Sequence, residues 1–163
     1  MEVESHWKEI KKLFNKSFSS SFHYSIATVD ESGKPHVTPI GSIILGNPGC
    51  AIYFEQFTNK LQTNLKSCKY VSVLAVNSSK WFWLKSLILG HFSELPAIRL
   101  QGEVSAPREA TKLEIKLWQK RVKSVGFTKG HKIIWQGMRT VREIKFYKVE
   151  PVSIGKMTES SSF

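Results

Sequence analysis

Short apolar segments separated by turn signals constrain the fold of this chain more than any other feature of its sequence. Residues 22–29 alternate between apolar and polar, which is the pattern of a half-buried strand. A turn cluster at 30–34 follows, with Gly33 able to adopt a positive φ, and a second strand is predicted over 35–45. Two such segments joined by a short turn predict an antiparallel hairpin.

The rest of the chain continues this pattern. Further strands are predicted at 50–55, 70–76, 97–105 and 141–149, and helices at 5–16, 59–67 and 107–125, the last opened by Pro107. The segment 81–92 is apolar, and its periodicity does not decide between a helix and a strand. The short links predict that the first three strands form a meander, and they argue against a parallel sheet. The expected fold class is therefore mainly β, a small antiparallel β-barrel with flanking helices outside.

Length and composition set the number of domains and the expected compartment. The 163 residues, 41% of them hydrophobic, suit one domain over 1–155, followed by a Ser-rich tail over 156–163 that we expect to be disordered. The acidic start is not followed by an apolar run, so no signal peptide is expected. The most apolar segment, 81–92, is shorter than the roughly 20 residues of a membrane span. These features predict a cytoplasmic protein without a membrane partner.

The charge of the chain is strongly basic. Lys and Arg total 24 against 13 for Asp and Glu, which gives a formal charge of +11. A charge this basic favours a polyanionic binding partner. The lysines of the predicted helix 107–125 are not interleaved with the aromatic residues that stack on bases. We therefore expect them to form a solvated helix face rather than a nucleic-acid-binding surface. A nucleic-acid-associated protein is kept as an alternative. Two isolated cysteines and five dispersed histidines predict no metal site.

Two segments carry residue types that suit a phosphorylated ligand. His36-Val37-Thr38-Pro39 lies in the second strand, where a proline implies a sheet edge or a bulge. Thr58, Asn59 and Lys60 lie at a strand-to-helix turn, and offer a hydroxyl, backbone N–H groups and a cation beside a helix dipole. The alternative is that Thr58 or Asn59 only caps the helix. The residues alone leave both readings open.

Three ordered motifs resemble one known family. The stretch ATVDESGKPHVTPI at 27–40 resembles the opening hairpin of the pyridoxamine 5'-phosphate oxidase-like, FMN-binding split-barrel family. The segment 59–65 with the strand from 70, and then 99–104, resemble its next two signatures, so the likeness covers about 22–151. The resemblance implies an antiparallel split β-barrel of the FMN-binding type, working as a homodimer with FMN at the dimer interface.

The resemblance also implies a cofactor-binding set of eight residues. They lie in the second strand and around the start of the second helix: His36, Val37, Thr38, Pro39, Phe57, Thr58, Lys60 and Thr63. The strand residues would follow the flavin ring and ribityl chain. Phe57 and Thr58 would flank the ring and the phosphate, and Lys60 would pair with the phosphate. Thr63 would substitute for a phosphate ligand that the family carries beside its lysine.

The expected activity follows from the cofactor, since no nucleophile–base pair is evident. The resemblance implies an FMN-dependent oxidoreductase that moves electrons or hydride between a reduced nicotinamide and a small-molecule substrate. The paired substrate arginines of true pyridoxamine phosphate oxidases are not recognisable here, which speaks against the vitamin B6 reaction. Some family members bind haem or a deazaflavin, so a non-catalytic flavin or haem sensor is the alternative.

Two further features have competing interpretations. Trp81-Phe82-Trp83-Leu84 either walls a flavin pocket or covers a dimer interface, where aromatic residues are enriched, or packs as part of an extra helix. Arg139 and Arg142 either reach the cofactor or an anionic substrate from the second subunit, or remain solvated surface charges.

Overall fold

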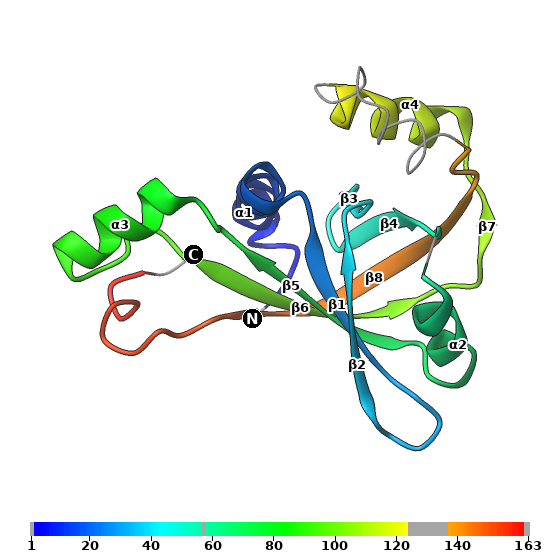
Figure 1. Ribbon diagram of the computed structural model, residues 1–163, viewed down its shortest axis with the longest axis horizontal. Helices are drawn as coiled ribbons and strands as arrows, with labels where there is room; N and C mark the ends of the chain where they lie inside the picture. The colour runs from blue at the N-terminus through cyan, green and yellow to red at the C-terminus, as the bar shows by residue number, and fades with distance from the viewer. Residues whose placement is uncertain (1, 57, 124–136, 162–163) are drawn as a thin grey trace.

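The structure, a computed structural model, describes residues 2–56, 58–123 and 137–161. In this part of the chain one antiparallel sheet of eight strands curls into an open half-barrel, with four helices around it (Figure 1). The strands are β1 (Tyr24–Val29), β2 (Pro35–Ile40), β3 (Ile44–Leu45), β4 (Cys50–Phe54), β5 (Tyr70–Val76), β6 (Ala97–Val104), β7 (Arg108–Glu109) and β8 (Thr140–Pro151). The helices are α1 (Trp7–Ser21), α2 (Asn59–Ser67), α3 (Lys80–Leu89) and α4 (Lys112–Arg121). The predicted mainly β class with flanking helices is confirmed.

The strand order explains how the sheet stays open. It runs β2-β1-β5-β6-β8-β4-β3, with β7 paired to β8, so β2 and β3 lie at its two ends. The predicted β1–β2 hairpin is confirmed, and Pro39 lies on an edge strand as its missing N–H requires.

The predicted three-strand meander is wrong, because the segment 35–45 breaks after Ile40. Ser42 is buried, and its hydroxyl accepts a hydrogen bond from the Phe54 N–H (3.1 Å) and donates one to the Phe54 carbonyl oxygen (2.9 Å). In a continuous strand, backbone groups would have made these bonds to Phe54. Here the Ser42 side chain makes them instead. The chain then pairs β3 with β4 at the far edge of the sheet.

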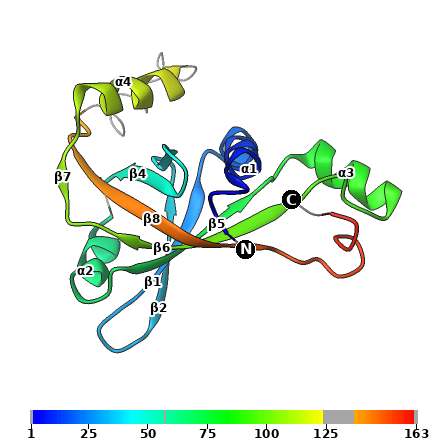
Figure 2. The same cartoon turned by 180° about the vertical axis from the view of Figure 1, so that it is seen from behind.

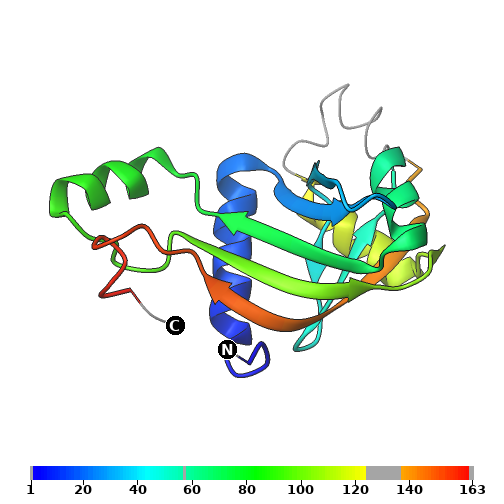
Figure 3. The same cartoon turned by 90° about the horizontal axis from the view of Figure 1, so that it is seen from below.

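Helix α1 packs against β5, β1 and β6 and closes the main core (Figure 3). Its buried face carries Trp7, Ile10 and Phe14, as the helical spacing predicts. The helix continues to Ser21, beyond the predicted end at Lys16, because Ser17 and Phe18 are also buried. The Ser17 hydroxyl accepts from the Val76 N–H at 3.2 Å, which ties the helix end to β5.

The segment after β6 differs from its prediction. Pro107 does not open a helix: residues 108–109 form β7, and α4 begins at Lys112. Thr111 is the N-cap, and its side chain and that of Glu114 form a reciprocal capping box. On its inner side α4 packs Trp118 against Phe54, with ring centroids 5.9 Å apart, in a second small core. In Figure 2 the ribbon of α4 lies apart from α1, but Arg121 at its end reaches the main core, where it donates to the Ile43 carbonyl oxygen at 2.6 Å and lies 4.0 Å from the Phe18 ring centroid.

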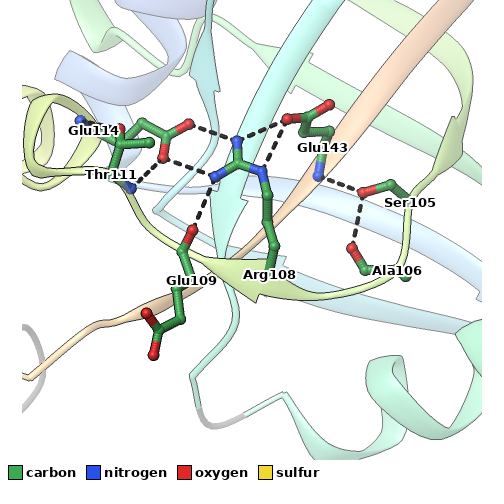
Figure 4. A network of polar contacts seen from close by, with 7 residues as sticks. All are labelled: Ser105, Ala106, Arg108, Glu109, Thr111, Glu114 and Glu143. Atoms are coloured by element: carbon green, nitrogen blue, oxygen red, sulfur yellow. Dashed lines mark hydrogen bonds and ion pairs between the residues drawn. The ribbon is translucent and has the colours of Figure 1, made fainter.

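A network around Arg108 holds the start of α4 to the sheet (Figure 4). The Arg108 guanidinium donates to both carboxylate oxygens of Glu114, at 3.0 and 2.7 Å, and to Glu143 Oε1 on β8, at 3.0 and 2.7 Å. The Thr111 N–H also donates to Glu114, at 2.8 Å. The hydrogen bonds from Arg108, with help from Thr111, lower the pKa of Glu114 to about 2.

Acid should weaken this attachment of α4. Because the folded pKa of Glu114 is depressed from its ordinary 4.5 to about 2, its contribution to stability is complete above pH 4.5 and is lost as the pH falls through about 2. We expect Glu114→Gln to lower the Tm at pH 7 by about 2–4 °C. Calorimetric melts should show this difference shrinking between pH 4.5 and 2, and a difference constant over that range would contradict the assignment.

Most of the ambiguous segment 81–92 belongs to α3 (Lys80–Leu89), whose C-cap Gly90 has the left-handed conformation (φ 73°). Residues 156–161, for which the sequence predicts a disordered tail, form turns beside the base of α3 (Figure 1). There Thr158 is buried, and the Ser161 hydroxyl donates to the Phe92 carbonyl oxygen at 2.8 Å. Among the described residues, no helix is long and apolar enough to cross a membrane.

Candidate functional site

The turn of the β1–β2 hairpin and helix α2 meet at a pocket of about 440 Å³. Its lining residues come from these two elements: Asp30, Glu31, Ser32, Lys60, Thr63, Asn64 and Ser67. Helix α2 is held there because Leu61 and Leu65 are buried in the main core. Fully buried Asn64 also donates from its side-chain amide to the Thr28 hydroxyl on β1, at 2.9 Å. Two of the sequence-predicted residues, Lys60 and Thr63, therefore lie at this pocket.

The Thr58 hydroxyl is the most unusual polar group at this end of α2. Thr58 is the N-cap and only 7% exposed, yet its side chain makes no capping hydrogen bond. Its Oγ1 atom is buried and has no partner among the described residues. A buried polar group left unpaired costs about 1–3 kcal/mol. The Thr58 side chain therefore does not cap α2 by a hydrogen bond, and its buried hydroxyl has no partner among the described residues.

The four predicted residues of β2 lie on two faces of the sheet. Thr38 pairs in register with Ile26 and His36 with Thr28, which places both on the core side, where they are half-buried. Val37 and Pro39 alternate to the outer side, and Val37 is 59% exposed. Buried Thr38 Oγ1 has no partner in the described parts of the chain. One ligand can contact all four residues only by lying along the edge of β2.

Lys60 already has a partner in this structure. Its ammonium nitrogen lies 3.8 Å from Asp30 Oδ2, and its side chain is 51% exposed. The other Asp30 oxygen accepts from the Ser32 N–H, the Ser32 hydroxyl and the Lys34 N–H, which fixes the turn. The hydrogen bond from the Lys34 amide, followed by that from the Ser32 hydroxyl, lowers the pKa of Asp30, so it stays ionised. An anion that uses Lys60 must compete with this carboxylate.

Asp30 was missed as a site residue, although the motif at 27–40 contains it. The signal was its position at the start of a turn, where Asp side chains bond the backbone two residues on. Thr63 is exposed, and its hydroxyl donates to the Asn59 carbonyl oxygen at 3.0 Å, within α2. That bond leaves Thr63 less suited than Thr58 to a phosphate. Phe57 lies outside the described residues.

Arg142 is not a solvated surface charge. Its Nε lies 2.5 Å from Glu55 Oε1, and the two side chains are only 11% and 6% exposed. Burial, followed by the nearby Glu55 charge, raises the pKa of the adjacent Tyr53. This ion pair is part of the barrel's interior. Arg139, the other candidate, is exposed. Within the described residues, no group of three or more His, Cys, Asp or Glu side chains is placed to hold a metal ion.

Several solved structures share this fold. HupZ of Group A Streptococcus gives a TM-score of 0.59 at 17% identity, over 91% of this chain and 94% of that one. An FMN-binding protein from Syntrophomonas wolfei gives 0.58 at 19% identity, over 93% and 95%. HutZ, the heme storage protein from Vibrio cholerae, gives 0.50 at 15% identity, over 93% and 95%. At identities this low the likeness shows the fold alone. Comparison with curated protein sequences gives no match.

A family model provides the stronger evidence. The model described as pyridoxamine 5'-phosphate oxidase matches residues 8–153, which takes in all eight strands of the sheet and nearly all of α1. The match and the curled antiparallel sheet agree with the resemblance of the motifs at 27–40, 59–65 and 99–104. This chain belongs to the pyridoxamine 5'-phosphate oxidase family.

Proposed function

We propose that this protein binds FMN as a homodimer and works as an oxidoreductase between a reduced nicotinamide and a small-molecule acceptor. The observation that carries the proposal is the buried, unpartnered Thr58 hydroxyl at the N-terminus of α2. In a chain of this family, that hydroxyl suits the FMN phosphate. When bound, FMN would supply the hydride and electron chemistry.

The phosphate is proposed to be held by three kinds of donor at the start of α2. The free N–H groups of the first turn carry the positive end of the helix dipole. Thr58 supplies a hydroxyl and Lys60 a charge-assisted hydrogen bond, which is among the stronger polar contacts. All three come from one rigid element whose inner face is buried, so their spacing is set before the ligand arrives.

The flavin ring and ribityl chain are proposed to lie along β2. This strand ends the sheet, so its outward N–H and C=O groups lack a strand partner in the described structure and are available to a ring that carries both donors and acceptors. His36 and Thr38 would contact it from the core side, and Val37 and Pro39 from the outer side. Phe57 is proposed to flank the ring, as the family resemblance implies.

Asp30 is expected to weaken FMN binding, since it competes with the phosphate for Lys60. We expect Asp30→Asn to tighten FMN binding by about two- to fivefold, because the asparagine oxygen keeps the turn bonds and only the charge is lost. Fluorescence titration with FMN measures the change, and added salt should reduce it. Glu31→Gln serves as control, since Glu31 lines the same pocket without pairing to Lys60 in the described structure, and an equal effect there would contradict the mechanism.

The direct test is the visible absorption spectrum of the purified protein, with and without added FMN. Flavin bands that remain with the protein through gel filtration are expected, together with their bleaching by a reduced nicotinamide. Thr58→Val keeps the shape of the side chain and removes the hydroxyl, so it should weaken FMN binding without unfolding the protein. A spectrum with no flavin and no response to FMN would overturn the proposal.

A haem-binding role is the second candidate. It is favoured by the fold shared with the V. cholerae heme storage protein and by half-buried His36, a residue type that ligates haem iron. A Soret band in the same spectrum, lost in His36→Ala, would select this role over FMN. Bound FMN that no reduced nicotinamide reduces would instead indicate a flavin carrier or sensor.

A further inference from the structure

A cleft of about 620 Å³ lies between the second half of α1 and the start of α3. Four serines, two asparagines and two lysines line it, together with Phe82 and Glu94. Its volume falls within the roughly 300–1,000 Å³ of small-molecule sites. Figure 1 shows α3 and α2 at opposite ends of the sheet, far apart. A ligand bound in this cleft would therefore not contact the pocket beside α2 in the same chain.

The Asn77 side chain brings an unpaired donor to this cleft. Asn77 lines the cleft although it is only 4% exposed. Its Oδ1 accepts a hydrogen bond from the Ser79 N–H at 3.2 Å, which identifies the other end of the amide as the Nδ2 donor. This nitrogen has no acceptor among the described residues. Buried polar groups are normally paired, so a donor left free at a cleft points to an acceptor on a ligand.

The start of α3 adds donors beside Asn77. Ser79 is the N-cap, but its side chain makes no capping hydrogen bond, and the first turn of the helix contains no acidic residue. The first N–H groups of a helix have no partner within it and carry the positive end of its dipole. Lys80 is exposed and forms no ion pair within the described residues. Backbone, amide and ammonium donors therefore meet at this end of the cleft.

The charges around the cleft favour an anion. Its charged lining residues are Lys16, Lys80 and Glu94. One Glu94 oxygen is bound by Lys16 and the other lies 3.2 Å from the Lys12 ammonium nitrogen, so both oxygens of this carboxylate are paired. A carboxylate neutralised in this way repels a bound anion little. Lys80, which has no such partner in the described chain, gives the start of α3 its positive charge.

We propose that this cleft binds a phosphorylated small molecule, with its phosphate group at the start of α3. The phosphate oxygens accept from the first N–H groups of the helix, the Asn77 amide and the Lys80 ammonium group. Three terminal oxygens suit donors that come from several directions better than the two of a carboxylate do. Phe82 offers an apolar wall to the rest of the ligand, and Asn15 and Ser19 offer polar contacts from α1. The proposal does not depend on FMN.

The test is an NMR titration of isotope-labelled protein with phenyl phosphate in about 0.15 M salt, where distant charges are screened. The backbone amide signals of residues 77–82 should shift. Lys80→Glu should raise the Kd at least about fivefold, because it replaces an attractive charge with a repulsive one. Lys85→Glu makes the same change on an exposed lysine further along α3 and should alter the Kd less than about twofold. Asn77→Asp keeps an acceptor for the Ser79 N–H and should abolish binding.

Other results would overturn the inference. Equal weakening by both lysine variants would mean a response to overall charge, and shifts confined to the start of α2 would leave the cleft without a ligand. Benzoate binding as tightly as phenyl phosphate would contradict the choice of phosphate. Circular dichroism should show each variant folded, and because Lys80 is exposed, its variant decides the result even if Asn77→Asp unfolds. Protein that binds phenyl phosphate at α3 but no FMN contradicts only the proposed function.

Discussion

Arg142→Ala is expected to lower the free energy of unfolding by about 3–5 kcal/mol, the largest effect of any single substitution considered for this protein. The reason is burial. The Arg142 and Glu55 side chains are 11% and 6% exposed, and their charged groups lie 2.5 Å apart. Removing the guanidinium would leave the Glu55 carboxylate buried without its partner, and would also remove the bond from Arg142 to the Ser105 carbonyl oxygen at 3.2 Å.

Urea unfolding of three variants would establish this cause. Arg142→Ala should reduce stability severely, whereas Arg142→Met combined with Glu55→Leu should recover most of it, because apolar side chains of similar size often replace a buried pair without loss. Arg139→Ala, on an exposed residue nearby, should change stability by no more than about 0.5 kcal/mol. If the double variant were as unstable as Arg142→Ala, lost packing rather than an unpaired charge would be responsible.

Lys60→Ala is expected to weaken FMN binding by about 1.5–3 kcal/mol, the usual contribution of a hydrogen bond to a charged group. Because the Lys60 side chain is 51% exposed, solvent screening places the effect near the lower value, about a tenfold rise in Kd. The stability of the protein without FMN should hardly change, since the Asp30–Lys60 contact is a half-exposed ion pair.

Lys66 provides the control for this experiment. It lies in the last turn of α2 and is exposed, so Lys66→Ala removes one positive charge from the same helix without touching its N-terminus. FMN titrations of both variants should show a loss of affinity for Lys60→Ala alone. Equal losses would mean that FMN responds to overall charge, and no loss in either would place the phosphate elsewhere.

Local segments with strong signals were predicted from the sequence nearly to the residue. Helix α2 and strand β5 have the bounds that their periodicity indicates, and the β1–β2 hairpin forms at its predicted turn. In these segments the pattern of apolar residues and the turn chemistry agree, so tertiary contacts only stabilise a structure that is already locally favoured. The same motifs carry the family resemblance, and with it Thr58 and Lys60.

Two of the mispredicted segments depend on a side chain that bonds a partner distant in the chain. The break after β2 depends on Ser42 bonding both backbone groups of Phe54, a residue twelve positions away. The late start of α4 depends on Arg108 joining Glu114 to Glu143, across 35 positions of the chain. No local pattern reports such partners, because each bond forms only once the sheet has brought the two segments together.

The sequence by itself determined the fold class, the family and the segments that carry the candidate site, because alternation, turns and motifs are properties of neighbouring residues. Only the tertiary structure decided the environment of each side chain. It paired Lys60 with Asp30, left the Thr58 hydroxyl buried without a partner in the described chain, placed Arg142 in the interior and left apolar side chains of α3 exposed. Burial and charge pairing depend on residues distant in the chain, and only the folded arrangement brings those residues together.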